Sequence, residues 1–343
     1  KRIPASHTTP EALDILRWIG ESERRPSGLV MEVSSHSLSL DRIGGLLYNT
    51  VVWTNLTQDH LDFHHDMESY YQSKKRLFTD YMVSGAPAVI NIDDPWGARL
   101  AEELTGANCV TYGRNEKARV RIVSWDCDWS GCRVEIEENG SRVTFSSALK
   151  GFFNIYNMAS MIAGARAMGF TDEQIQSAFD NVKTVPGRMD RVDADVPFSV
   201  VIDYAHTPDA LENVLKAARP LTKGRLICVF GCGGDRDRTK RPIMGRIVSE
   251  NSDEAIVTSD NPRTEKPQAI IDQILDGIPL DFPHMVCTER RSAIKQALSI
   301  AREGDCVIIA GKGHENYQEI NGVKHHFDDR EVVMELLAHG DKN

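Results

Sequence analysis

Short apolar runs alternate with helical patterns along the first part of the chain. Residues 29–33, 50–54 and 88–92 are mostly apolar and have the length of strands buried in a parallel sheet. Between the last two runs, a segment that begins near Asp66 has the pattern of a helix. This alternation predicts an α/β fold with mostly parallel sheets.

The first helix is predicted to begin at Thr9, which acts as its cap, with Pro10 and Glu11 in the first turn. Its apolar face is expected to consist of Leu13, Leu16 and Ile19.

Residues 118–146 break this rhythm, because polar and apolar residues alternate there around Ser-Gly and Asn-Gly turns. The pattern predicts an antiparallel meander, followed by a helix over about 154–168.

Two domains are predicted, because a chain of 343 residues is too long for one ordinary core. A Pro-Gly stretch at 184–188 places the boundary between domains of residues 1–184 and 185–343. The second domain repeats strand and helix regularly, which predicts a doubly wound sheet. Its strands are expected at about 198–203, 225–230, 253–258, 284–288 and 305–310.

The formal net charge of -10 argues against nucleic acid and an anionic membrane surface as partners. No apolar run has the length of a membrane span, and residues 1–7 lack a signal-peptide core. We therefore expect a cytoplasmic protein that acts on small molecules. The cysteines number seven and form no zinc-type pair of pairs, so reduced, buried thiols are expected.

Polar clusters follow the predicted strands, where ligands bind in open α/β sheets. Glu32 lies at the end of the first apolar run and His60 lies in the polar segment after the second, so both are candidates to share a cation. An alternative is a metal-dependent hydrolase site formed by His60, Asp62 and His64, although the usual His-x-His spacing is missing.

The turn at 260–263 (DNPR) ends a predicted strand of the second domain. Pro262 fixes the backbone there, so Arg263 is well placed to grip a carboxylate in a bidentate manner. A solvated surface arginine is the alternative. In the preceding loop, Gly231, Gly233 and Gly234 would let backbone N–H groups approach an anion beside Arg236, although no P-loop motif occurs in the chain.

Many ordered motifs of the chain resemble the Mur ligase family, and within it the MurE type. They are EVSSHSLSLDR, TNLTQDHLDFHHDMESYYQSK, NIDD, GFFNIYNMASMIAGA, PGRMDR, DYAHTPDALENVL, VFGCGGDRDRTKRPIMG, TSDNPRTE and AGKGHENYQ. The resemblance covers essentially the whole chain. It implies part of a Mur ligase central ATPase domain, followed by a Rossmann-like doubly wound C-terminal domain.

Proteins of this type resemble the chain only in their later part. Their N-terminal UDP-binding domain and the P-loop of their central domain have no counterpart here. The resemblance therefore implies a fragment that is inactive alone.

The implied activity is ATP-dependent amide ligation in peptidoglycan precursor synthesis. ATP would phosphorylate the D-glutamate side chain of UDP-MurNAc-L-Ala-D-Glu, and the amine of meso-diaminopimelate would attack the acyl phosphate. Mg²⁺ is the implied cofactor.

The resemblance also assigns site residues. Mg²⁺ is expected at Glu32, His60 and a carbamylated Lys74, because CO2 turns a neutral amine into a carboxylate. Lys74 and His206 are assigned to catalysis. The residues expected to bind ATP are Asn154, Asn157, Arg188 and Asp203. Those expected to bind the UDP-linked dipeptide are Thr8, Thr9, Ser34 and Arg42. Those expected to bind diaminopimelate are Arg236, Asp260, Asn261, Pro262, Arg263, Gly311 and Glu315.

Two other interpretations remain open. A metal-dependent hydrolase would hold zinc or iron tightly, whereas a non-catalytic fragment would bind the amino acid and turn nothing over.

Overall fold

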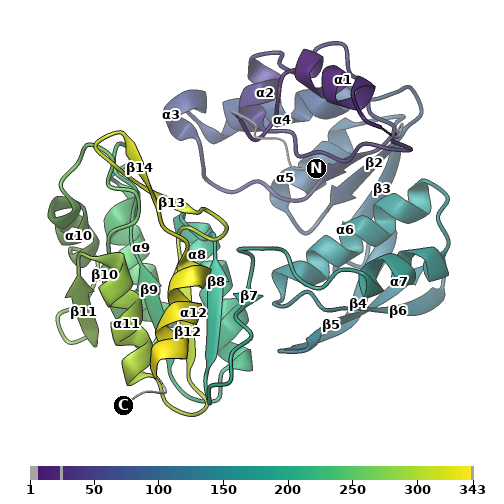
Figure 1. The fold of residues 1–343 in the computed structure, drawn as a ribbon. Helices are drawn as coiled ribbons and strands as arrows, with labels where there is room; N and C mark the ends of the chain where they lie inside the picture. Colours follow the sequence, from purple (N-terminus) through teal and green to yellow (C-terminus); the bar gives the residue numbers. More distant parts are fainter. Residues whose placement is uncertain (1–6, 24–25, 341–343) are drawn as a thin grey trace. The chain divides into compact units, whose positions relative to one another are not determined.

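The computed structural model describes residues 7–23 and 26–340 of the chain, which form two compact units (Figure 1). The first unit contains the chain up to Trp125 together with Val134–Phe145 and Tyr156–Ser177. The second contains Asp126–Arg133, Ser146–Ile155 and the chain from Ala178 onward. The domain boundary between residues 184 and 185 remains a prediction.

The first sheet has six strands in the order of the sequence. Its first three strands pair in parallel, and its last three are joined by tight turns, as the predicted meander requires. The strands are β1 (Val51–Trp53), β2 (Pro87–Asn91), β3 (Asn108–Gly113), β4 (Val120–Asp128), β5 (Gly131–Glu138) and β6 (Ser141–Ser147).

Seven helices accompany these strands among the described residues. They are α1 (Ala12–Gly20), α2 (Ser35–Ser39), α3 (Leu61–His64), α4 (Met67–Thr79), α5 (Pro95–Glu103), α6 (Phe153–Ala167) and α7 (Asp172–Asp180). The predicted helix near Asp66 is confirmed as α4, because the Asp66 carboxylate caps it by accepting a hydrogen bond from Ser69 N at 2.7 Å. The helix predicted over 154–168 is confirmed as α6.

Two predictions near the start of the chain are wrong. The cap position of α1 is Glu11, and the buried residue of this helix is Ile15, whereas Leu13 and Leu16 are 75% and 51% exposed. The run at 29–33 forms no strand, because it pairs with no neighbouring strand among the described residues, and Val30 is fully exposed. Glu32 therefore lies in a loop and not at a strand end.

The second sheet has the strand order β11-β10-β9-β12-β8-β7, in which only β7 runs antiparallel to its neighbour. Its strands are β7 (Asp190–Arg191), β8 (Ser199–Asp203), β9 (Leu226–Phe230), β10 (Glu254–Thr258), β11 (His284–Cys287) and β12 (Cys306–Ala310). All five strands predicted for this domain are confirmed, since β8 to β12 lie at the expected positions.

Helices cover both faces of this sheet (Figure 1). One apolar core is built with α8 (Pro208–Ala218), α9 (Lys240–Asn251) and α10 (Pro267–Leu275). The other is built with α11 (Arg290–Ile300) and α12 (Asp329–Gly340). A short 3-10 helix (Arg219–Leu221) follows α8, and a hairpin of β13 (Tyr317–Ile320) and β14 (Val323–His326) follows β12. The predicted doubly wound architecture is confirmed. No helix of the described ranges is long and apolar enough to cross a membrane.

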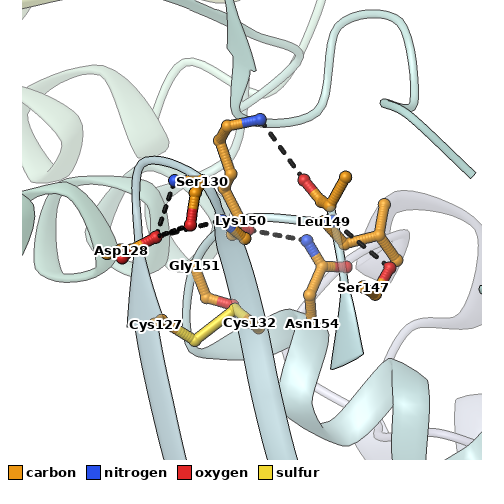
Figure 2. Close-up of a disulfide and its surroundings, with 11 residues drawn as sticks. Cys127, Asp128, Ser130, Cys132, Ser147, Leu149, Lys150, Gly151 and Asn154 are labelled. Carbon is orange, nitrogen blue, oxygen red and sulfur yellow. Dashed lines mark hydrogen bonds between the residues drawn. A yellow bond between two sulfur atoms is a disulfide. The ribbon is translucent and has the colours of Figure 1, made fainter. Parts of the chain in front are cut away.

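The prediction of reduced, buried thiols is wrong for Cys127 and Cys132, which form a disulfide across the β4–β5 hairpin (Figure 2). Of the five free cysteines, Cys228, Cys232 and Cys306 are buried as predicted, whereas Cys109 and Cys287 are partly exposed. The tight turn between the strands places the two residues opposite each other, with their Cα atoms 4.2 Å apart. Sequence spacing does not reveal such pairing, because it depends on strand register.

Candidate functional site

The carboxyl ends of β10 and β12 meet in one polar cluster, as parallel neighbours of β9. Asp260 and Asn261 follow β10, and Gly311 and Glu315 follow β12. Asn261 Nδ2 donates to Glu315 Oε2 at 2.9 Å, which joins the two loops directly. The structure therefore brings these four sequence-predicted residues together.

Asp260 places a carboxylate oxygen in this cluster that has no partner among the described residues. Its side chain is almost buried, and Oδ1 accepts from Asn261 N at 2.6 Å while Oδ2 accepts nothing. Gly311 makes room for that oxygen, because a Cβ at this position would lie 2.4 Å from it. A buried, unsatisfied acceptor of this kind calls for a water or a cationic ligand.

Lys312 is a member of the cluster that the sequence did not single out. Its side chain is fully buried, and Nζ lies 3.2 Å from both Asn261 Oδ1 and Glu315 Oε2. Glu315 Oε1 takes no partner within the described ranges, so this buried lysine holds one oxygen of the carboxylate and leaves the other open. A lysine between two glycines in GKGHE carries no local signal that its side chain is buried.

Arg263 lies on the same turn as Asp260 and is held in a fixed position. Its backbone is left-handed, with φ of 51°, and its Nη1 donates to Gly234 O at 2.8 Å. Its Nε lies 3.4 Å from Glu319 Oε2. Arg263 is thus half-buried and oriented by the protein, unlike a solvated surface arginine.

Two further residues of this predicted set contribute less to the cluster. Pro262 is buried in the turn, and its carbonyl accepts from Glu265 N at 3.0 Å. Arg236 is exposed, and its Nη1 donates to the neighbouring Asp235 O at 3.1 Å.

Asp203 ends β8 and is nearly buried. Its two oxygens accept from Met189 N at 2.7 Å and Ala205 N at 2.8 Å. Burial raises the pKa of Asp203, although these two N–H groups and the charge of Arg188 act in the opposite direction. The carboxylate therefore ties the segment before β7 to the loop that follows β8.

Arg188 and His206 lie near the same strand end, and both contact Tyr204. The Arg188 guanidinium is 5.3 Å from the Tyr204 ring centroid, and His206 Nδ1 is 2.8 Å from Tyr204 O. The side chains of both residues are exposed and available for a ligand.

The two asparagines assigned to ATP lie on α6. Asn154 is buried, and its Nδ2 donates to Lys150 O at 2.7 Å (Figure 2). Asn157 is exposed.

Lys74 lies on α4 within electrostatic reach of two carboxylates. Burial lowers the pKa of Lys74, while the charges of Glu32 and Asp59 raise it. Its Nζ lies 5.5 Å from the Tyr70 ring centroid. Burial, with help from the same two carboxylates, raises the pKa of Tyr70 to about 12. The sequence identified Glu32 but missed Asp59, which stands next to His60.

His60 adopts a left-handed backbone conformation at the start of α3 and lies close to this group. Its Nε2 is 3.5 Å from Asp59 Oδ2, and its ring centroid is 6.1 Å from that of Tyr70. His64 is occupied elsewhere, because its Nε2 is 2.8 Å from Ser35 Oγ and its ring stacks on Tyr70. The side chain of Asp62 lies outside the described part of the structure.

Within the described ranges, no three His, Cys, Asp or Glu side chains are arranged to hold a metal ion.

Three of the residues predicted to hold the UDP-linked dipeptide lie together. The Thr9 hydroxyl accepts from Ser34 N at 2.9 Å and donates to Glu32 O at 3.0 Å, a role that replaces the predicted helix cap. The backbone carbonyl of Arg42 accepts a hydrogen bond from Ala12 N, in the first turn of α1, at 2.7 Å. Thr8 is exposed beside them.

Comparison with known proteins identifies the family. Residues 2–165 match the Mur ligase middle domain, and residues 187–313 match the Mur ligase glutamate ligase domain. A Gloeobacter violaceus protein named UDP-N-acetylmuramoyl-L-alanyl-D-glutamate--2,6-diaminopimelate ligase is 50% identical over 97% of this chain and 68% of its own length. A Geobacter metallireducens protein of the same name is 46% identical over 97% of this chain and 69% of its own length.

A solved structure titled with that enzyme name is 36% identical, covering 98% of this chain and 70% of its own, with a TM-score of 0.65. The predicted fold class and the resemblance are therefore confirmed. This chain belongs to the Mur ligase family of ATP-dependent amide ligases.

Proposed function

We propose that the protein joins meso-diaminopimelate to the D-glutamate side chain of UDP-MurNAc-L-Ala-D-Glu through an acyl phosphate made from ATP. The names of its relatives support this substrate set. The observation that carries the proposal is the cluster after β10 and β12. There, the Arg263 guanidinium is held by Gly234 O and lies on the same turn as Asp260, whose Oδ2 has no hydrogen-bond partner among the described residues.

The cluster matches the far end of meso-diaminopimelate, which bears a carboxylate and an ammonium on one carbon. Arg263 would take the carboxylate, and Asp260 Oδ2 and Glu315 Oε1 would take the ammonium; the orientation of Arg263 and the open oxygens support this assignment. Each charge-assisted contact contributes about 1.5 to 3 kcal/mol. Lysine lacks the carboxylate and would leave the guanidinium without its ligand.

Glu32, His60 and carbamylated Lys74 are the residues that would hold Mg²⁺. The unmodified side chains offer too few acidic or imidazole ligands in the described part of the chain, so the carbamate would supply a missing oxygen ligand. When bound, Mg²⁺ would neutralise charge on the transferring phosphoryl group. Burial favours the neutral Lys74 amine, which adds to CO2 and releases one proton to form the carbamate.

The remaining assignments belong to the same proposal. ATP would be bound by Asn154, Asn157, Arg188 and Asp203, and His206 is the further catalytic candidate. The UDP-linked dipeptide would be bound by Thr8, Thr9, Ser34 and Arg42. An ATP-dependent reaction on these small molecules fits a cytoplasmic location.

The test is an Arg263→Ala variant of the natural protein, assayed by amide product formation. We expect kcat/KM for diaminopimelate to fall by at least about tenfold, with KM for ATP and the dipeptide nearly unchanged. Arg246→Ala is the matched control, because Arg246 is an exposed arginine of α9. If Arg263→Ala leaves the preference for diaminopimelate over lysine intact, the proposed pocket is wrong.

A further inference from the structure

The β13–β14 hairpin is joined to the turn that carries Arg263. Arg263 N donates to Glu319 O at 3.0 Å, and Asn321 N donates to Arg263 O at 2.7 Å. Glu319 N also donates to Asn261 Oδ1 at 2.9 Å. The backbone of the turn is thus locked to β13, and the side chain of Glu319 is carried to a fixed place beside the turn.

The Arg263 guanidinium is held on two sides. Nη1 donates to Gly234 O at 2.8 Å, and Nε lies 3.4 Å from Glu319 Oε2. Gly233 leaves space for it, because a Cβ there would lie 2.9 Å from Nη1. A guanidinium has five N–H donors, and Nη2 makes no hydrogen bond within the described ranges. The Nη2 group is therefore available to a ligand carboxylate.

Glu319 consequently has two opposing effects on such a ligand. As an acceptor beside Nε, it orients the guanidinium, which lowers the cost of forming a bidentate pair. As an anion, it repels a second carboxylate that approaches the same guanidinium. It also keeps Arg263 charge-paired when the ligand has no carboxylate, so a ligand such as lysine is penalised less than a bare arginine would penalise it.

We propose that Glu319 is a specificity-determining residue that limits how strongly Arg263 discriminates between amino-acid substrates with and without a far carboxylate. The inference rests on the proposed function, since it assumes that Arg263 receives the substrate carboxylate. Glu319 is a positioning residue and need not touch the substrate.

The isosteric variant Glu319→Gln separates the two effects. The amide oxygen keeps an acceptor beside Arg263 Nε, while the competing negative charge is removed. In the natural protein, with ATP and the UDP-linked dipeptide saturating, we expect kcat/KM for meso-diaminopimelate to rise at least about threefold, the size of a carboxylate repulsion at about 6 Å in a water-like medium. We expect kcat/KM for L-lysine to fall, because bound lysine would then remove water from a guanidinium that has no anionic partner.

Opposite changes for the two substrates distinguish this role from a purely structural one, which would move both in the same direction. Glu331→Gln is the matched control, because Glu331 is an exposed acid that pairs with His326 of the same hairpin and should change neither substrate. If Glu319→Gln leaves both substrates unchanged, shifts them together or weakens the use of diaminopimelate, the inference is wrong. If the wild-type protein prefers lysine, the proposed function fails first and the inference fails with it.

Discussion

Replacing Asp329 with Asn tests whether a buried ion pair supports the strand end that carries Gly311. The first residues of α11 and α12, Arg290 and Asp329, have fully buried side chains and form two hydrogen bonds, from Nε to Oδ1 at 2.8 Å and from Nη2 to Oδ2 at 2.7 Å. Nη2 also donates to Ala310 O at 3.0 Å, at the end of β12. Burial alone would lower the pKa of Arg290, but the Asp329 carboxylate outweighs it and keeps the guanidinium charged.

Asp329→Asn removes the anion and leaves a buried guanidinium uncompensated. Breaking such a pair costs about 3 to 5 kcal/mol, and losing a negative charge at the start of α12 adds about 0.3 to 1 kcal/mol. Native-state hydrogen exchange of the β12 amides measures this free energy without requiring that the two units unfold together. We expect the opening free energy of β12 to fall by at least about 3 kcal/mol.

Two variants serve as controls for Asp329→Asn. Glu335→Gln removes the partner of Arg291 in an exposed pair on the same two helices and should cost less than about 1 kcal/mol. The double change Arg290→Met with Asp329→Leu removes both charges and should recover most of the loss. A cost for Asp329→Asn no larger than that of Glu335→Gln would refute the reasoning, as would a double variant no more stable than the single one.

Three further variants test other features of the structure. Gly311→Ala should reduce kcat/KM for diaminopimelate by at least about tenfold, because its Cβ would displace a pocket carboxylate and its φ is +116°. Gly322→Ala, where φ is also positive but no atom lies within 4 Å, should leave that value unchanged. Lys74→Ala should abolish ligation, and added short carboxylic acids should restore part of the activity. Lys75→Ala is the control and should retain ligation, because Lys75 binds Glu103 instead. Full activity of Lys74→Ala would disprove the carbamate. Cys127→Ser opens a short disulfide loop and should lower the opening free energy of the β4–β5 hairpin amides by about 2 kcal/mol, and an unchanged exchange rate would show that the bond adds no stability.

Part of the candidate site was predictable from local sequence. The turn at Asp260 and Pro262 follows from side chains that bond their own backbone and from a fixed φ. Gly311 is predictable from its motif, but the reason for a glycine lies in the tertiary structure, where Asp260 Oδ2 occupies the space of a Cβ. The contacts of Lys312 with residues of a distant loop have no local signal, because nothing in GKGHE indicates where that side chain points.

The sequence by itself determined the alternation of strands and helices in the second unit, because runs such as Cys306–Ala310 are apolar at every position and must be buried on both faces. It also determined the family, through ordered motifs that lie on the loops after those strands. Only the tertiary structure decided the partners of those loops. The run at 29–33 is apolar enough for a strand, but a strand exists only where another strand supplies its hydrogen bonds. In the same way, the pairing of Cys127 with Cys132 and of Arg263 with Glu319 depends on register between segments, which local propensity does not specify.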